Sequence, residues 1–473
     1  SRRQPAMAEV TMEHGKPMPD DNVVVLDEVM AAAGLGYFHL RLVMACGLGF
    51  SAAAVEVVLS GFLLTEIREK WHASEYTLSL LPTIVGIGTT IGELFWGWVA
   101  DRCGRRIVFL VTVGVVVLFG VLSAFSPGMV MLTATRCLVG TGYGGNIAVD
   151  FTLYVEMLPT RNRGEMLIAV AAFWPLGQTV TVLLAWLTIP NYGWRTFLIA
   201  CAVPSFLTCF LRPFIPESPR WLLLRGYESE AIEVCRQIAE LNGLTAEQVG
   251  LARGGGTRLV LSNEAEKLYK PEGETPSMMP SLISKTLWKT TLGCLIFSGM
   301  LSWGGYASMT FMPSFLQMKG MESMDMYKSM LISSVSQVPG ILLAAWCGRR
   351  IGRLGPMSVS LLLQAAALSV FAFVRTSALM IFCSCLASCF SEFGWAFSHV
   401  YVPEAFPTEV RALALGVVSG MGSVISLFAP LLTATLLDWG SAALAVLVFA
   451  AVLVLGSISI FFLLHVETLD RDL

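Results

Sequence analysis

Long apolar segments separated by short polar ones run along most of the chain. A helix that spans a bilayer needs about 20 predominantly apolar residues, and twelve segments of roughly that length can be delimited. Six lie in the first half, at 42–64, 77–100, 107–126, 129–155, 165–189 and 194–215. Six lie in the second half, at 287–312, 329–347, 355–374, 378–402, 412–437 and 441–464. The pattern predicts an all-α membrane protein with twelve transmembrane helices.

A hydrophilic stretch divides the predicted helices into two bundles of six. It covers residues 216–285 and includes a predicted amphipathic helix at 228–242. We interpret this stretch as a cytoplasmic linker rather than a domain. The predicted organisation is a cytoplasmic N-terminal segment 1–41, a bundle 42–215, the linker 216–285, a second bundle 286–464 and a cytoplasmic tail 465–473. Five prolines fall inside predicted helices and permit kinks there: Pro82, Pro175, Pro204, Pro339 and Pro430.

Two charged motifs recur in the second half at a constant offset of 248 residues, which indicates an internal duplication. The offset relates Gly104, Arg105, Glu156, Pro159, Thr160 and Arg163 to Gly352, Arg353, Glu404, Pro407, Thr408 and Arg411. Such a repeat is expected of transporters that are built from two similar bundles.

Composition supports the membrane assignment and excludes several other classes. The chain is 55% hydrophobic and only 14% charged, with a mean hydropathy of +0.69, so lipid is its main solvent. The net charge of -3 gives no sign of a nucleic-acid partner. All cysteines except Cys103 and Cys235 lie in apolar segments without metal-ligand spacing, so we read them as small core residues and expect no metal site.

The distribution of positive charge predicts the orientation. Most of the 31 lysines and arginines lie in segments on the same side as the N-terminus. Because cytoplasmic loops carry an excess of these residues, both termini are predicted to be cytoplasmic. No signal peptide is expected, since residues 1–41 are polar and mixed, and the first helix would itself direct insertion. Whether the chain resides in the plasma membrane or in an internal membrane stays open.

Three motifs in the first half resemble those of the major facilitator superfamily. They are GWVADRCGRR at 97–106, RCLVGTGYG at 136–144 and PESPRW at 216–221. The chain is also similar to a narrower group, the synaptic vesicle 2-related proteins and the plant nicotinate and organic cation transporters. This likeness rests on Glu56, on TLYVEMLP at 152–159, GWR at 193–195, YVPEAFPTEVRALALG at 401–416 and the ending VETLDRDL. The resemblance implies the major facilitator fold, with two pseudo-symmetric six-helix bundles.

The sequence departs from the family pattern at two places. In the second-half copy of the charged loop, Arg349 replaces the expected aspartate, which suggests an asymmetric cytoplasmic gate. Around Glu56, small apolar residues such as Ala53 and Val57 replace acidic and methionine-rich neighbours. The second departure leaves the family's substrate open for this chain.

The resemblance also implies a cytoplasmic gate of paired charges at helix ends. Its expected members are Asp101, Arg102, Gly104, Arg105, Glu156, Arg163, Glu217, Arg220, Glu404 and Arg411. The alternative is that the arginines only anchor the helices on the cytoplasmic side. Glu93 and Asp150 lie within about two turns of the predicted helix ends, so we assign them to the gate or its surroundings.

Ionisable residues inside predicted membrane helices are candidates for substrate binding or proton coupling, because burying their charge is costly. They are Glu56 near the middle of the first helix, Arg136, and the pair Glu392 and His399, which lie on one face of a helix. The alternative for each is a neutral or hydrogen-bonded packing role. Trp303 and Tyr306 flank Gly304 and Gly305, and these aromatic rings are candidates for the wall of a binding pocket. Trp174 is a weaker candidate, because a tryptophan in a membrane helix more often anchors the helix at the interface between membrane and water.

The sequence therefore predicts a secondary transporter that moves a small organic ion by alternating access, with proton coupling. No GxxxxGK[ST] loop for ATP occurs, and no nucleophile, metal or cofactor motif indicates an enzyme. The expected partners are the lipid bilayer, a small organic solute and protons, and we expect a monomer without cofactors. A nicotinate-like carboxylate and an organic cation remain open as substrates. A neutral sugar-like solute, or a sensor that keeps the fold without transport, are the alternatives.

Overall fold

The structure is a computed structural model, and its description covers most of the chain. The described residues are 23–159, 163–251, 258–261, 282, 284, 287–348, 350–406, 408–439 and 441–464. Arg349, the first 22 residues and the tail 465–473 lie outside them.

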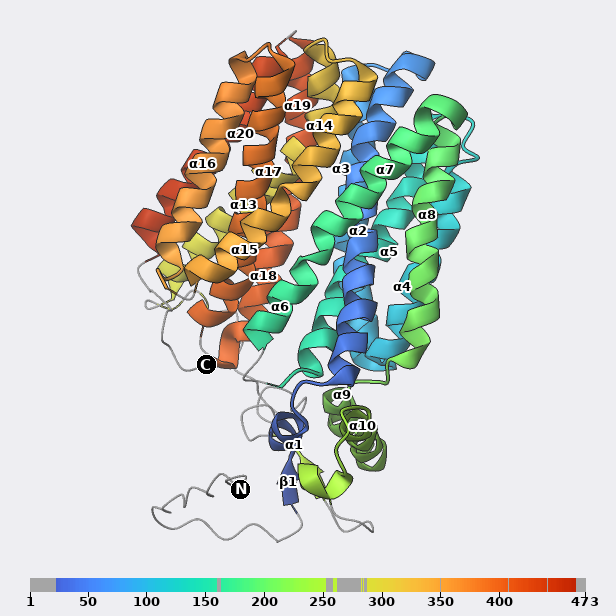
Figure 1. Cartoon of the computed structure of the whole chain (residues 1–473), viewed down its shortest axis with the longest axis vertical. Helices are drawn as coiled ribbons and strands as arrows, with labels where there is room; N and C mark the ends of the chain where they lie inside the picture. The colour runs from blue at the N-terminus through green and yellow to red at the C-terminus, as the bar shows by residue number, and fades with distance from the viewer. Residues whose placement is uncertain are drawn as a thin grey trace, which may run out of the picture.

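Two helical bundles stand side by side, one from each half of the chain (Figure 1). The first bundle contains α2 Tyr37–Trp71, α3 Glu75–Cys103, α4 Arg105–Ser123, α5 Met129–Glu156, α6 Arg163–Ala171, α7 Phe173–Tyr192 and α8 Trp194–Leu211, which continues into the short helix η2 Arg212–Phe214. The second contains α13 Trp288–Met318, α14 Ser323–Val335, α15 Gln337–Gly348, α16 Leu354–Phe373, α17 Ser377–Ala405, α18 Thr408–Ser426, α19 Phe428–Asp438 and α20 Ala442–Leu463.

The apolar segments form helices long enough to cross a membrane. Within the described residues, 10 helices or collinear helix pairs meet the length and hydropathy expected of a membrane span. The long helices α5 and α13 are not among the ten. Both occupy inner positions, with α5 against α2, α3 and α4, and α13 against α2, α18 and α20. Helices that are shielded from lipid in this way can carry glycine and polar residues, so their place in the bundles is consistent with a total of twelve.

Three of the long helices are interrupted, and a proline explains each break. Pro175, Pro339 and Pro430 are the third residues of α7, α15 and α19. A proline lacks the backbone N–H and its ring displaces the carbonyl four residues earlier, so the helix is broken just before it. Each break lies directly before α7, α15 or α19, and therefore within one of the spans Met166–Tyr192, Ser323–Gly348 and Ala414–Asp438.

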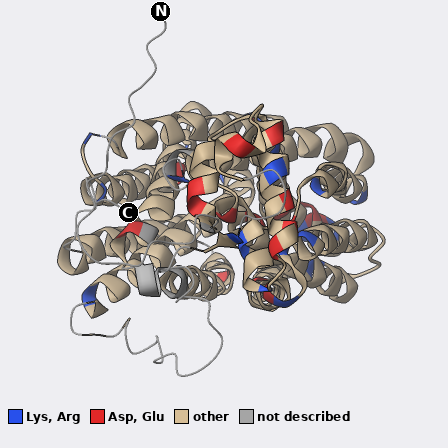
Figure 2. Ribbon diagram, turned by 90° about the horizontal axis from the view of Figure 1, so that it is seen from below, with Lys and Arg blue, Asp and Glu red and all other residues tan. Residues whose placement is uncertain are grey.

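A small module lies beyond one end of the bundles, which we call the linker end (Figure 1). The module contains β1 Val23–Val25, α1 Leu26–Ala33, α9 Pro219–Leu224, α10 Glu228–Leu241, η3 Ala246–Val249 and β2 Arg258–Val260. The amphipathic helix expected at 228–242 corresponds to α10. Seen from this end, acidic and basic residues gather over the module and the neighbouring helix ends (Figure 2).

The module joins the segment before the first bundle to the segment after it. Strands β1 and β2 pair in parallel, with Val24 opposite Leu259. Val29 of α1 and Ile238 of α10 belong to one buried cluster that continues into Leu42 of α2. The linker region therefore packs against the first bundle as well as connecting the two bundles.

Asn242, which follows α10, fastens the module to the start of α2. Its side-chain oxygen accepts a hydrogen bond from the Phe38 backbone N–H at 3.1 Å. Its amide nitrogen donates to the carbonyl oxygens of Ala33 and Gly34 at 3.0 and 3.2 Å. These bonds satisfy backbone groups at the turn between α1 and α2, where no regular structure can do so.

The thiol of Cys235 in α10 offers a test of this packing. Burial raises the pKa of the Cys235 thiol to about 12, so at pH 8 only about one thiol in ten thousand is the reactive thiolate. We expect Asn242→Ala to leave backbone groups without partners, at a cost of about 1–3 kcal/mol, and to raise the rate at which maleimide modifies Cys235. The exposed Cys103 is the internal reference. Gln237→Ala, which removes an exposed amide from the same helix, should leave the rate unchanged. Equal rates for Cys103 and Cys235 in the unmodified chain would contradict the packed module.

Candidate functional site

A cavity of about 110 Å³ lies between the two bundles. The first bundle contributes side chains of α2, α3, α5 and α7, and the second contributes side chains of α13, α18 and α19. The lining includes Ser60, Thr89, Glu93, Tyr143, Trp174, Tyr306, Thr310 and Ser423. Mostly apolar walls with a few polar groups are typical of a small-molecule site.

Among the described residues of this lining, Glu93 alone has a carboxyl group, and it connects the two bundles. The hydroxyl of Ser423 in α18 donates a hydrogen bond to its Oε2 at 3.3 Å. Glu93 was expected at the gate or in its surroundings, but it lies at the cavity. Helix α3 continues to Cys103, so Glu93 lies about 15 Å from the helix end at 1.5 Å per residue.

Glu56 and Arg136 form a buried ion pair beside the cavity. Arg136 Nη2 lies 2.5 Å from Glu56 Oε2, and each residue is only 1% exposed. The pair joins α2 to α5 within the first bundle. Val57 and Ser60, the neighbours of Glu56 on α2, line the cavity, whereas the two charged groups do not.

A closed ring of six aromatic side chains extends from the cavity toward the linker end. Neighbouring ring centroids lie 4.9 to 6.4 Å apart. The members, in order around the ring, are Phe50, Phe151, His399, Trp395, Tyr306 and Trp174. Three come from each bundle. Of the six contacts in this ring, two join the bundles: Phe151 with His399, and Trp174 with Tyr306.

The remaining membrane candidates occupy different places. Tyr306 lines the cavity, whereas Trp303 is partly buried against a hydrophobic cluster that contains residues of both bundles. Glu392 is 6% exposed on α17 and does not contribute to the cavity lining. His399 is stacked between Phe151 and Trp395.

Amides and hydroxyls also connect the bundles near the middle of the membrane. Gln178 of α7 and Gln337 of α15 exchange two hydrogen bonds, at 3.0 and 2.8 Å, and both side chains are buried. One turn away, the hydroxyls of Thr179 and Ser334 lie 3.0 Å apart. Neutral hydrogen bonds of this kind can break and re-form without exposing a charge to lipid.

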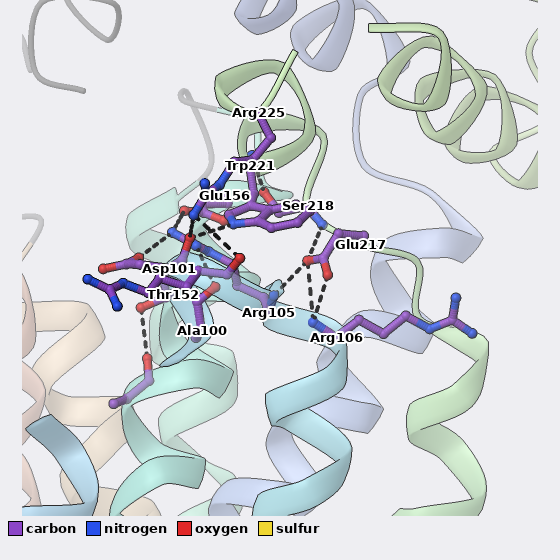
Figure 3. Close-up of polar contacts among 12 residues, drawn as sticks. Ala100, Asp101, Arg105, Arg106, Thr152, Glu156, Glu217, Ser218, Trp221 and Arg225 are labelled. Atoms are coloured by element: carbon purple, nitrogen blue, oxygen red, sulfur yellow. Dashed lines mark hydrogen bonds and ion pairs between the residues drawn. The ribbon is translucent and has the colours of Figure 1, made fainter. Parts of the chain in front are cut away.

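At the linker end, Arg105 occupies the centre of a polar cluster (Figure 3). Its guanidinium lies 2.9 Å from Asp101 and 3.3 Å from Glu156, and it donates to the Ala100 carbonyl at 3.0 Å. The residue is only 3% exposed. The cluster therefore ties together the adjoining ends of α3, α4 and α5.

Glu217 and Trp221 attach the module to the same place (Figure 3). The Glu217 carboxylate accepts hydrogen bonds from the backbone N–H groups of Arg105 and Arg106, at 2.9 and 3.1 Å. A carboxylate at a helix N-terminus accepts hydrogen bonds from the free backbone N–H groups there and interacts favourably with the helix dipole. Gly104 precedes this helix with φ of 101°, and a side chain there would collide with Glu217. Trp221 donates its indole N–H to the Asp101 carbonyl at 2.9 Å.

The second half repeats the same construction at the predicted offset. Arg353 contacts Glu404 at 3.1 Å and donates to the Gly348 carbonyl, as Arg105 does to Glu156 and Ala100. Gly352 has φ of 100°, matching Gly104. In the described residues, each of these pairs lies within one half of the chain and not between the halves.

The other expected gate residues are more dispersed. Arg102 lies over the Trp98 ring at 3.9 Å, and Arg220 pairs with Asp27 of α1. Arg163 begins α6, and Arg411 lies in α18, where its side chain is outside the described residues. Asp150 is buried against Arg212 at 2.7 Å, which supports the end of α5 from inside the bundle.

Several residues at the cavity and in the aromatic ring could not be recognised from the sequence. Ser423, Tyr143 and Phe151 carried no distinguishing signal, because serine, tyrosine and phenylalanine are common in membrane helices. Tyr306, which was expected to form a pocket wall, does line the cavity, whereas Glu93 was assigned to the gate because its helix was predicted to end at residue 100 and in fact continues to Cys103.

Comparison with known proteins identifies the family. The model of the family described as sugar (and other) transporters matches residues 48–473. The organic cation/carnitine transporter 7 of Arabidopsis thaliana is 30% identical, over 96% of this chain and 97% of its own length. The synaptic vesicle 2-related protein of Xenopus laevis is 30% identical, over 96% and 83%. The niacin transporter NiaP of Acinetobacter baylyi is 29% identical, over 84% and 87%.

Solved structures share the fold. The proton:xylose symporter XylE has a TM-score of 0.71 at 17% identity, covering 92% of this chain and 98% of that one. A partially occluded inward-open structure of XylE from E. coli has a TM-score of 0.73 at 16% identity, covering 92% and 100%. The chain therefore belongs to the sugar (and other) transporter family and is a multi-pass membrane transporter of the major facilitator superfamily.

Proposed function

We propose that this transporter is a secondary active carrier that moves a small organic ion by alternating access, with proton coupling. The cavity between the bundles is the observation that carries the proposal. Because both halves line it, rocking of one bundle against the other would open it to one side of the membrane at a time. Organic cation and niacin transporters among the relatives support a small organic ion as the solute.

Different contacts close the two sides of the cavity. Away from the linker end, α3 packs against α19 and α7 packs against α14. Toward the linker end, which we assign to the cytoplasm from its positive charge, the aromatic ring covers the cavity. On that side the ring joins the bundles at Phe151 with His399 and at Trp174 with Tyr306, and α6 of the first bundle also contacts α17 of the second. Opening toward the linker end would separate these contacts.

The Glu56–Arg136 pair is the proposed site of proton coupling. A proton on Glu56 removes one charge of the pair, and Arg136 then needs a new partner because an unpaired charge in the membrane is costly. The pair lies one residue from the cavity lining on α2. Protonation can thus bias the arrangement of α2 against α5, and with it the shape of the cavity.

Uptake into proteoliposomes tests the proposal. The labelled panel contains nicotinate, 1-methylpyridinium, a hexose and benzoate, each measured with and without an inward proton gradient. We expect the gradient to stimulate uptake of one organic ion. Glu56→Gln should abolish this stimulation but retain exchange of solute across the membrane, because glutamine resembles the protonated acid and cannot release a proton.

Glu66→Gln is the matched control. Glu66 lies on the same helix but pairs with Lys70 nearer the surface, so its loss should leave the stimulation unchanged. Full gradient stimulation in Glu56→Gln would contradict the coupling role. Folded protein that takes up no panel member would instead favour a sensor that retains the fold, and uptake of the hexose alone would favour a neutral solute.

A further inference from the structure

The cavity contains a carboxylate but no cation to neutralise it. Among the described residues of the lining, Glu93 is the only one with a carboxyl group, and none is a lysine, arginine or histidine. In the described part of the chain, no lysine, arginine or histidine lies within ion-pair distance of it. Its contact with Ser423 at 3.3 Å comes from a neutral hydroxyl.

Other acids inside the first bundle have partners. Glu56 lies 2.5 Å from Arg136, Asp150 lies 2.7 Å from Arg212, and Glu156 lies 3.3 Å from Arg105. A charged carboxylate in the membrane is costly unless it is paired or hydrated. Glu93 differs from these acids in facing the cavity, so a cationic partner from outside the protein can reach it.

Aromatic rings surround the same space. Tyr143 and Trp174 from the first bundle and Tyr306 from the second line the cavity. The rings of Trp174 and Tyr306 meet at nearly a right angle, with centroids 6.4 Å apart. Aromatic faces attract cations, most strongly where water is excluded. An anion such as nicotinate would find no positive side chain in this lining and would be repelled by Glu93.

We propose that Glu93 binds the positively charged group of the solute and selects small organic cations over carboxylates. The ligand class is a quaternary ammonium, pyridinium or protonated amine with a small apolar body, which Tyr143, Trp174 and Tyr306 surround. Because Glu93 also accepts a hydrogen bond from Ser423 of the other bundle, the bound cation competes with a contact between bundles. The inference rests on the proposed transport function and names its substrate class.

Two flat probes of similar size and opposite charge test the selection: 1-methylpyridinium and nicotinate. Binding is measured on the purified protein by quenching of tryptophan fluorescence, independently of transport. We expect the unmodified protein to prefer 1-methylpyridinium. Glu93→Gln should weaken that affinity by about 10- to 100-fold, the effect of losing one charge-assisted contact. Glu93→Asp, which keeps the charge, should retain the preference for the cation.

Glu322→Gln removes an exposed carboxylate at the start of α14 and should leave both affinities unchanged. Ser423→Ala should preserve the cation preference, since it removes only the competing hydroxyl. An unchanged affinity for 1-methylpyridinium in Glu93→Gln would overturn the inference. So would a preference of the unmodified protein for nicotinate, but in that case nicotinate uptake into proteoliposomes would leave the proposed transport function standing.

Discussion

Replacing Arg136 with methionine should destabilise the protein and abolish transport. The substitution leaves the Glu56 carboxylate buried without its partner, and breaking a buried ion pair in this way costs about 3–5 kcal/mol. Both side chains are 1% exposed, so water cannot replace the lost guanidinium. The midpoint of thermal unfolding of the purified protein in detergent measures the loss.

The double variant separates a structural effect from a functional one. Adding Glu56→Gln to Arg136→Met removes the second charge, and we expect most of the lost stability to return, as in a double-mutant cycle of coupled residues. Transport driven by a proton gradient should stay absent. Arg350→Met is the control, because it removes an exposed guanidinium that lies over Trp346. If Arg136→Met unfolds at the same temperature as the unmodified protein, the pair does not stabilise the bundle.

Replacing Gly144 with valine should separate α3 from α5 and prevent correct folding. Four glycines bring the backbones of these helices into direct contact, and an added side chain at any of them would collide with a carbonyl oxygen of the other helix. They are Gly88, Gly92, Gly140 and Gly144. Close contact through small residues is a main source of helix association in membranes. Overpacking at one such position costs about 1–3 kcal/mol where side chains can adjust, and a rigid backbone should raise that cost.

Size-exclusion chromatography and thermal unfolding measure this effect. We expect Gly144→Val and Gly92→Val to yield little monodisperse protein, and Gly144→Ala to show an intermediate loss. The matched control is Gly114→Val on α4, where an added Cβ meets no atom within 4 Å. A yield and unfolding temperature for Gly144→Val equal to those of Gly114→Val would show that the two helices do not need this close approach. Because α3 carries Glu93 and α5 carries Tyr143, a shift between them would also alter the cavity.

Local pattern predicted much of the fold. Apolar segment length specified the helices, because each must bury its backbone polar groups within itself in lipid. Prolines marked positions where helices can break, although only the structure shows that Pro175, Pro339 and Pro430 interrupt a span and Pro82 and Pro204 do not. The offset of 248 residues predicted a repeated site. The ion pairs Arg105–Glu156 and Arg353–Glu404, which are related by this offset, confirm the repetition.

The sequence by itself determined the number and order of the apolar segments, the two-fold repeat and the family. Only the tertiary structure decided that Glu56 pairs with Arg136 while Glu93 faces the cavity. It also decided that β1, which precedes the first bundle in the sequence, pairs with β2, which follows it. The physical reason is that these helices are apolar on nearly all sides. Without a polar face, a helix carries no record of its rotation about its own axis. The packing of the helices therefore decides that Glu56 pairs with a basic side chain and that Glu93 is available to a ligand.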